Sequence, residues 1–259
     1  MHARIDPGRL RYYRTHLRRW FHAHGRDLPW RRTRDAYQIL VSEIMLLQTQ
    51  APRVAQVYPE FLARFPTIDA VAAARLREVK RLTDPLGYKI RGLWIKQIAD
   101  EVVKYRHGEV PNTVEELMAL PGVGRYTAGA VMTFAHGVPA PILDTNVERV
   151  LGRWFAGALP PDDPPARRRR RLWALAAAIL PRDDGWSINQ GLMDFGAQIC
   201  TARHPACGGC VMRRRCHYIR ADGGRAERQV VQWIVVGAAP TAKGSGAGSA
   251  PRRRARARS

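Results

Sequence analysis

Apolar residues recur along the chain at intervals of three and four, which is the spacing of one face of an α-helix. In the segment 37–48 they stand at positions 37, 40, 41, 44 and 45. Short stretches with glycine or proline separate such segments. The pattern predicts an almost entirely helical protein, with helices over 10–23, 37–48, 51–64, 68–73, 75–82, 90–105, 113–119, 126–134, 146–155, 168–179 and 187–199.

The end of the chain differs from the rest. A run of β-forming residues occupies 229–236, and sequence rich in Gly, Ala, Ser, Pro and Arg follows it. We therefore expect a short strand-like segment and a disordered basic tail over 223–259.

The charge of the sequence indicates a polyanionic partner. The formal net charge is +21 over 259 residues. The segment 240–259 holds six cations and no acid, and removing it leaves about +15 on the remainder. Nucleic acid is the first candidate partner and a membrane surface the second. No apolar stretch is long enough to span a membrane, so no membrane association is expected.

The four cysteines indicate a metal site rather than a disulfide framework, because all of them lie within one short segment. Cys200, Cys207, Cys210 and Cys216 are separated by six, two and five residues. Four thiolates suit a [4Fe–4S] cluster. Zinc also accepts four thiolates, although its usual pattern is two short pairs. Together with an N-terminus that has no apolar signal core, this predicts a reducing, cytoplasmic location near the nucleoid.

The segment Leu120 to Gly129 reads Leu-Pro-Gly-Val-Gly-Arg-Tyr-Thr-Ala-Gly between two expected helices. Glycines let backbone approach a ligand closely, and the second helix presents free N–H groups and the positive end of its dipole. Such a hairpin can hold a phosphate without reading sequence. A plain turn is the alternative. The phosphate site would be formed by Gly122, Val123, Gly124 and Arg125.

This hairpin resembles the helix–hairpin–helix of the base-excision glycosylase superfamily that includes endonuclease III. The resemblance extends from about residue 20 to 217, including the spacing of the cysteines. Trp30, Leu86-Gly-Tyr88 and the segments 42–50 and 142–146 look most like the MutY-type adenine glycosylases. The resemblance implies an all-α, two-lobed glycosylase fold with a [4Fe–4S] cluster loop. A six-helix domain is expected at 30–138, and a cluster domain at 1–29 with 139–222.

The activity implied is that of a monofunctional DNA glycosylase in base excision repair. Such an enzyme would act as a monomer on double-stranded DNA with a mismatched or damaged base pair. It would hydrolyse the N-glycosidic bond of adenine opposite 8-oxoguanine or guanine. Hydrolysis of this kind needs a proton for the leaving base and an anion to stabilise the positive sugar, which two carboxylates can supply.

Glu43 is the first candidate carboxylate. It is the only charged residue in 37–48, and Ile39, Leu40, Leu46 and Leu47 stand one turn away on either side. Burial there would raise its pKa and suit a general acid. The alternative is a glutamate that reaches solvent or pairs with an arginine. By resemblance, Glu43 protonates the adenine.

Asp144 is the second candidate, with Asn146 beside it. Its ordinary role would be an N-cap, although Thr145 or Asn146 could cap instead. By resemblance, Asp144 stabilises the sugar cation or bonds to it transiently. Tyr126 stands where bifunctional relatives carry a Schiff-base lysine, so no strand cleavage is expected.

Further roles rest on the resemblance. Arg31, Leu46 and Gln190 would line the base pocket, and an amide such as that of Gln190 offers both a donor and an acceptor. Gln48 and Tyr88 would enter the duplex beside the extruded nucleotide.

Several residues depart from the adenine glycosylases. Thr145 replaces a glycine, Leu47 a glutamine and Lys89 a frequent tyrosine. Thymine or uracil glycosylases acting opposite guanine also carry Tyr and Asp at the positions of Tyr126 and Asp144, so they form the alternative enzyme class. A non-catalytic DNA-binding protein on the same scaffold is a further alternative.

The run Arg167 to Arg171 is either a solvated helix start or a phosphate contact.

Overall fold

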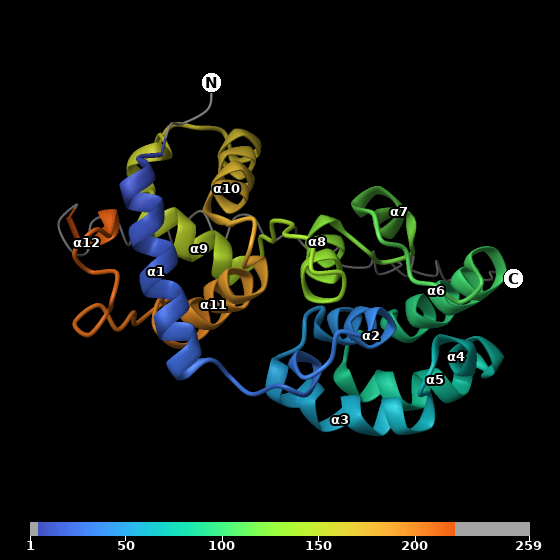
Figure 1. The fold of residues 1–259 in the computed structure, drawn as a ribbon. Helices are drawn as coiled ribbons and strands as arrows, with labels where there is room; N and C mark the ends of the chain where they lie inside the picture. Colours follow the sequence, from blue (N-terminus) through green and yellow to red (C-terminus); the bar gives the residue numbers. More distant parts are fainter. Residues whose placement is uncertain (1–4, 221–259) are drawn as a thin grey trace, which may run out of the picture.

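The structure is a computed structural model that describes residues 5–220. In this part of the chain every regular element is a helix, and the helices form two groups that lie side by side (Figure 1). The strand and tail expected at 223–259 lie outside the described residues. The elements are α1 (Pro7–His24), η1 (Pro29–Arg31), α2 (Ala36–Leu46), α3 (Ala51–Arg64), α4 (Ile68–Ala73), α5 (Leu76–Thr83), η2 (Asp84–Leu86), α6 (Arg91–Arg106), α7 (Val114–Ala119), α8 (Arg125–Phe134), α9 (Thr145–Trp154), η3 (Ala156–Ala158), α10 (Pro165–Ile179), α11 (Gly185–Gln198) and α12 (His217–Arg220).

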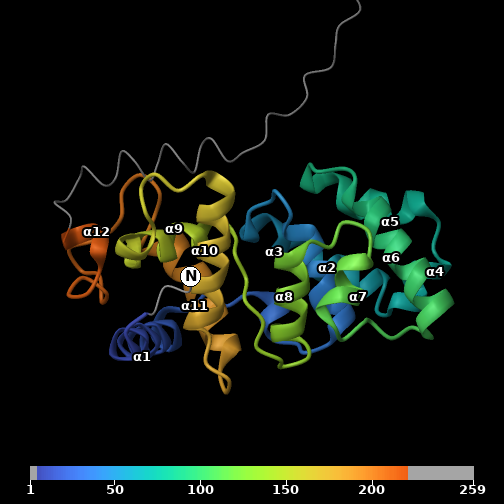
Figure 2. The same cartoon turned by 90° about the horizontal axis from the view of Figure 1, so that it is seen from above.

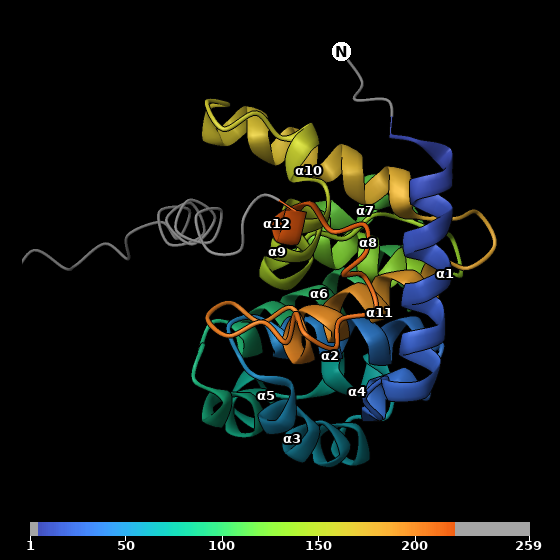
Figure 3. The same cartoon turned by 90° about the vertical axis from the view of Figure 1, so that its left-hand side faces the viewer.

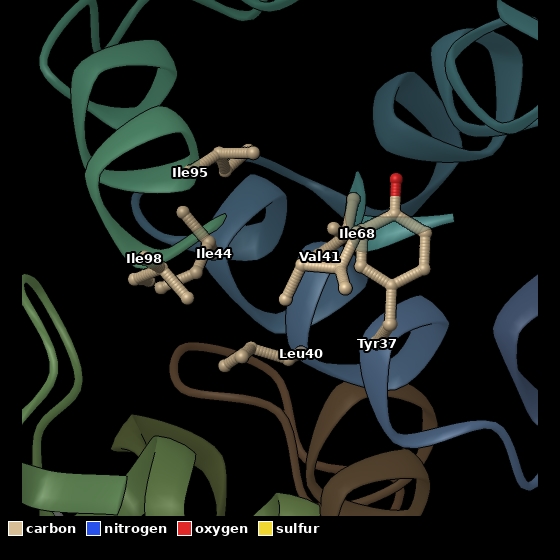
Figure 4. Close-up of a pocket in the computed structure, with 7 residues that line it drawn as sticks. All are labelled: Tyr37, Leu40, Val41, Ile44, Ile68, Ile95 and Ile98. Carbon is tan, nitrogen blue, oxygen red and sulfur yellow. The ribbon is translucent and has the colours of Figure 1, made fainter. Parts of the chain in front are cut away.

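The first lobe contains α2 to α8 and is built around α2. Eight of the eleven residues of α2 are buried, because α3, α6 and α8 pack around it. An apolar gap between α2, α4 and α6 is lined by Tyr37, Leu40, Val41, Ile44, Ile68, Ile95 and Ile98 (Figure 4). None of the predicted site residues lines this gap, so it belongs to the core of the lobe.

The second lobe contains α1 and α9 to α12, which come from the two ends of the described chain. Helix α1 packs along α11, and α11 packs against α9 (Figure 2). Tyr13 of α1 stacks on Trp154 at the end of α9, with ring centroids 4.7 Å apart. Two connections therefore cross between the lobes, one from α1 to η1 and one from α8 to α9.

The predicted helices are confirmed, with ends that differ by up to three residues. The expectation of six helices in 30–138 was wrong, since that range contains the seven α-helices α2 to α8. Ala74 and Arg75 adopt extended backbone, and this separates the short α4 from α5. The 3₁₀ turns and the four-residue α12 were not predicted, because elements this short carry no periodic signal.

Candidate active site

Glu43 lies near the end of α2, where the two lobes meet. Its side chain is 3% exposed, and Oε2 has no hydrogen-bond partner among the described residues. Burial raises the pKa of Glu43 to about 7, against a hydrogen bond from Tyr126 that lowers it. The negative charge of Asp144 raises this pKa further, and the cation of Arg31 lowers it. A carboxyl group with a pKa of about 7 is partly protonated at neutral pH, as a proton donor requires.

Tyr126 enters the site from the first turn of α8. Its hydroxyl donates to Sδ of Met193 at 3.3 Å and also lies near the carboxyl of Glu43. Burial, followed by the charges of Glu43 and Asp144, raises its pKa well above the ordinary value. Gly129, one turn further along α8, lets the chain before α9 approach closely, since a Cβ there would meet the Pro141 carbonyl oxygen at 2.4 Å. This contact brings Asp144 toward Tyr126.

Asp144 is the N-cap of α9. Its Oδ1 accepts a hydrogen bond from the backbone N of Val147 at 2.7 Å, and its Oδ2 accepts one from Nδ2 of Asn146 at 3.0 Å. Burial raises the pKa of Asp144, while these two hydrogen bonds and the charge of Arg149 lower it. The carboxyl group is thus fixed in position, and burial outweighs the hydrogen bonds and the Arg149 charge, so that its pKa lies above the ordinary value. The cap is Asp144 itself rather than Thr145 or Asn146.

Arg149, which the sequence analysis missed, continues this network toward the cysteine loop. Its Nη2 donates to Oδ1 of Asn146 at 2.7 Å, and its Nε donates to the carbonyl oxygen of Cys200 at 2.7 Å. The candidate carboxylate Asp144 is therefore joined through two side chains to the backbone of the first cysteine.

Three of the residues predicted to line the site carry a buried polar atom without a partner in the described range, and other such atoms lie elsewhere, for example on Arg91 and Arg153. Oε1 of Gln190, Oε2 of Glu43 and Nε of Arg31 have no hydrogen-bond partner among the described residues. Gln190 is 3% exposed on α11. A buried polar atom without a partner costs roughly 1–3 kcal/mol, so these atoms point to a polar ligand.

The guanidinium of Arg31 is held by Asp194, another residue that the sequence analysis did not assign. Nη1 and Nη2 of Arg31 donate to the two carboxylate oxygens at 2.7 and 2.9 Å. Only Nε of Arg31 remains unpaired, so a hydrogen bond from this side chain to a base would be limited to the single N–H at Nε. Leu46 is half-buried at the end of α2.

Gln48 lies at the exposed tip of the loop after α2. Its φ of 55° is in the left-handed region, which residues other than glycine rarely adopt. Such strain persists where the surroundings impose it and is common at functional sites. Arg91 imposes part of it, because Nη2 donates to the Leu47 carbonyl at 2.6 Å and to Oγ1 of Thr49 at 2.8 Å.

The Tyr88 loop is tied to the Gln48 loop. Oγ1 of Thr49 donates to the carbonyl oxygen of Leu86 at 3.1 Å. The ring of Tyr88 packs edge-on against Trp94, and the guanidinium of Arg91 lies 5.9 Å from its centroid. The two loops predicted to enter the duplex are thus neighbours in space.

The glycine hairpin joins α7 to α8 as predicted. Gly122 has a φ of +74°, and a Cβ there would meet the ring of Trp94 at 2.4 Å. Gly124 is the N-cap of α8, with no side chain covering the helix end. Val123 is buried, whereas Arg125 is exposed and lies over the ring of Trp173 in α10, 4.0 Å from its centroid.

The four cysteines lie together in the loop between α11 and α12. Burial, together with the other three thiols, raises the pKa of the Cys210 thiol to about 12, against a backbone hydrogen bond from Met212 that lowers it. Nη1 of Arg153 donates to Sγ of Cys200 at 3.4 Å, which places a cation beside this thiol. Among residues 5–220, no three potential ligands converge on a point where one metal ion could bind. A [4Fe–4S] cluster takes one thiolate on each of its four irons, and the four thiols of this loop are a donor set of that kind.

No helix in the described range is long and apolar enough to cross a bilayer.

Comparison with known proteins agrees with this geometry. Residues 41–178 match the family described as HhH-GPD superfamily base excision DNA repair protein. The thymine-DNA glycosylase of Aeropyrum pernix is 38% identical over 226 residues, which cover 84% of this chain and 99% of that protein. The adenine DNA glycosylase of Homo sapiens is 37% identical over 224 residues, covering 83% of this chain but 41% of that protein. A trapped endonuclease III–DNA covalent intermediate has a TM-score of 0.69 at 28% identity, covering 84% of this chain and 98% of that one.

Proposed function

The chain belongs to the HhH-GPD superfamily of base excision DNA repair proteins, as a DNA glycosylase of that family, and we propose that it hydrolyses the N-glycosidic bond of mispaired adenine. The observation that carries this proposal is the pairing of Glu43 with Asp144. Both carboxyls are mostly buried at one site, each influences the pKa of a common neighbour, Tyr126, and the two have different surroundings.

Because their surroundings differ, Glu43 and Asp144 take different roles in the reaction. Glu43, with its pKa raised by burial to about 7, donates a proton to a ring nitrogen of the flipped adenine. The C1′–N9 bond then breaks, and its electron pair leaves with the neutral base. Asp144, held by Asn146 and Val147, stabilises the cation that forms on the sugar. Water adds to C1′, and its proton returns to the ionised Glu43.

Adenine is favoured because a purine is a poor leaving group until a ring nitrogen is protonated, and the site offers a protonated acid. Gln190 would recognise the base edge, with Leu46 and Arg31 completing the pocket. The unpaired Oε1 of Gln190 is a free acceptor for an exocyclic amine.

Tyr126 makes the proposed reaction monofunctional. A Schiff base with the sugar needs a primary amine, which a tyrosine side chain lacks. The product would be an abasic site with an intact strand.

The backbone of Gly122 to Arg125 would hold a phosphate, and Gln48 and Tyr88 would fill the gap left by the flipped nucleotide. The cost of flipping is a few kcal/mol. Because the backbone of Gln48 already adopts its left-handed conformation, less ordering is needed when this residue enters the duplex.

The cysteine loop would hold a [4Fe–4S] cluster through Cys200, Cys207, Cys210 and Cys216. When bound, such a cluster cross-links the loop and can exchange electrons. The loop also carries Arg203, Arg213, Arg214 and Arg215, which are exposed cations available to phosphates.

Thymine or uracil opposite guanine is the second candidate target. Its support is the similarity to the Aeropyrum pernix thymine-DNA glycosylase over almost the whole of that protein.

A panel of duplexes tests the proposal. Matched duplexes with A·8-oxoguanine, A·G, T·G or U·G are incubated with excess protein and then cleaved with alkali at abasic sites. We expect release from the two adenine duplexes. Release from T·G but not from A·G would replace adenine by the second candidate, and no release from any duplex would overturn the glycosylase activity.

A further inference from the structure

Five consecutive arginines open α10, and the structure separates them into two sets. Arg167 and Arg171 form ion pairs with the buried Asp163, at 3.8 and 2.5 Å. Arg168 interacts with Asp163 and with Glu148 in the first turn of α9. Arg169 and Arg170 are exposed, and neither forms an ion pair or hydrogen bond with any residue in 5–220. The two local acids therefore interact with the other three arginines of the run. No ion pair within residues 5–220 neutralises Arg169 or Arg170.

The free arginines lie next to the glycine hairpin. Trp173 follows Arg169 by four residues and Arg170 by three, so the three side chains share one side of α10. Arg125, the residue directly after the Gly122–Gly124 turn, stacks on this same Trp173 at 4.0 Å. The cation–π contact thus bridges the two lobes, and the arginine pair lies one helical turn from Trp173, the residue that the hairpin's Arg125 contacts.

The start of α10 is also accessible to a large partner. Figure 3 shows its amino-terminal end reaching beyond the other helices of the lobe, whereas α1 lies on the opposite side of the molecule. Ala166, Arg167 and the two free arginines are all exposed there. No described carboxylate other than Asp163 and Glu148 interacts with the arginine run.

We propose that Arg169 and Arg170 form a second backbone-binding surface, which continues the hairpin site along duplex DNA away from the flipped base. The proposal rests on the proposed function for the identity of the nucleic acid. The hairpin fixes one phosphate through main-chain groups, Arg125 is held beside it by Trp173, and the α10 pair contacts the phosphates that follow. These contacts carry no sequence information and add affinity on any duplex that extends past the lesion.

The experiment measures the salt dependence of binding for the full chain. The double variant Arg169→Gln with Arg170→Gln is compared with wild type and with Arg11→Gln plus Arg19→Gln. The latter removes the same charge from exposed positions on α1. The probe is a long A·G duplex whose target nucleotide carries a non-hydrolysable sugar. All three proteins keep the Arg-rich segment 252–258, so its contribution cancels.

Loss of two phosphate contacts should reduce the slope of log K against log salt by about 2 and weaken binding on the order of tenfold at low salt. The α1 variant should keep the wild-type slope. Unfolding temperatures should agree among the three proteins, since Arg169 and Arg170 make no bonds to lose. A wild-type slope in the α10 variant, or an equal loss in the α1 variant, would overturn the proposal. Wild-type binding with no base release from any duplex would instead refute the proposed function and leave this measurement valid.

Discussion

Arg31 and Asp194 form a two-point ion pair beneath the candidate active site, with both side chains almost fully buried. The two residues are 163 positions apart, and their contact joins η1 to α11. Burial alone would raise the pKa of Asp194, but Arg31 and Arg26 hold it below its ordinary value. Asp194 thereby neutralises the charge of Arg31, the same cation that lowers the pKa of Glu43.

The substitution Asp194→Asn leaves that cation unbalanced. Breaking a buried pair from one side typically costs about 3–5 kcal/mol, which unfolding measurements will detect. The uncompensated Arg31 should also lower the pKa of Glu43, so the alkaline limb of base release should shift to lower pH. The exposed Asp162→Asn is the matched control. An unshifted pH profile in a folded Asp194→Asn variant would show that the pair is purely structural.

The pH dependence of base release follows from the raised pKa of Glu43. The acid must be protonated to donate, so the competent fraction is high below the pKa of about 7 and falls as pH rises through it. Single-turnover release should therefore decline by about tenfold per pH unit on the alkaline side. The exposed Glu60→Gln variant should follow the wild-type curve. A rate that rises through this range would contradict a protonated Glu43.

Tyr126→Lys tests whether the tyrosine is what prevents strand cleavage. An amine at this position would attack C1′ and form a Schiff base that borohydride reduces to a stable protein–DNA adduct. We expect the adduct with this variant and not with wild type. Tyr105→Lys, at a position 68% exposed, is the control and should give none. An adduct with wild-type protein would show that another amine serves as nucleophile.

Metal analysis tests the cysteine loop. The purified protein should contain iron and acid-labile sulfide in equal amounts and little zinc. Cys210→Ser should lose most of the iron, because a hydroxyl is a poor substitute for a thiolate. His204→Gln, an exposed change in the same loop, should keep it. Zinc in place of iron would identify a different centre.

Much of this architecture could be predicted from sequence because its signals are local. The helical spacing of apolar residues gave the elements, and it also indicated that Glu43 would be buried on α2. The spacing of the cysteines and the Pro-Gly-x-Gly hairpin are similarly contiguous patterns. Asp144 was identified both as a cap and as a candidate catalytic group, and the structure shows it capping α9.

Other features depend on contacts between distant segments. Asp194 is a single acid on a buried helix, and its partner Arg31 lies at the other end of the chain. Arg149 reaches the carbonyl oxygen of Cys200 only because α9 packs against α11. The left-handed backbone at Gln48 could not be predicted, since glutamine does not favour it and Arg91 acts from a separate helix.

The most direct test of the account is single-turnover base release by Glu43→Gln on an A·G duplex, with binding to the same duplex measured in parallel. Glutamine keeps the size of the side chain and cannot donate an acidic proton. The account predicts that release falls by about 100-fold or more while the duplex is still bound. Release at the wild-type rate would contradict Glu43 as the proton donor, and with it the assignment of the site.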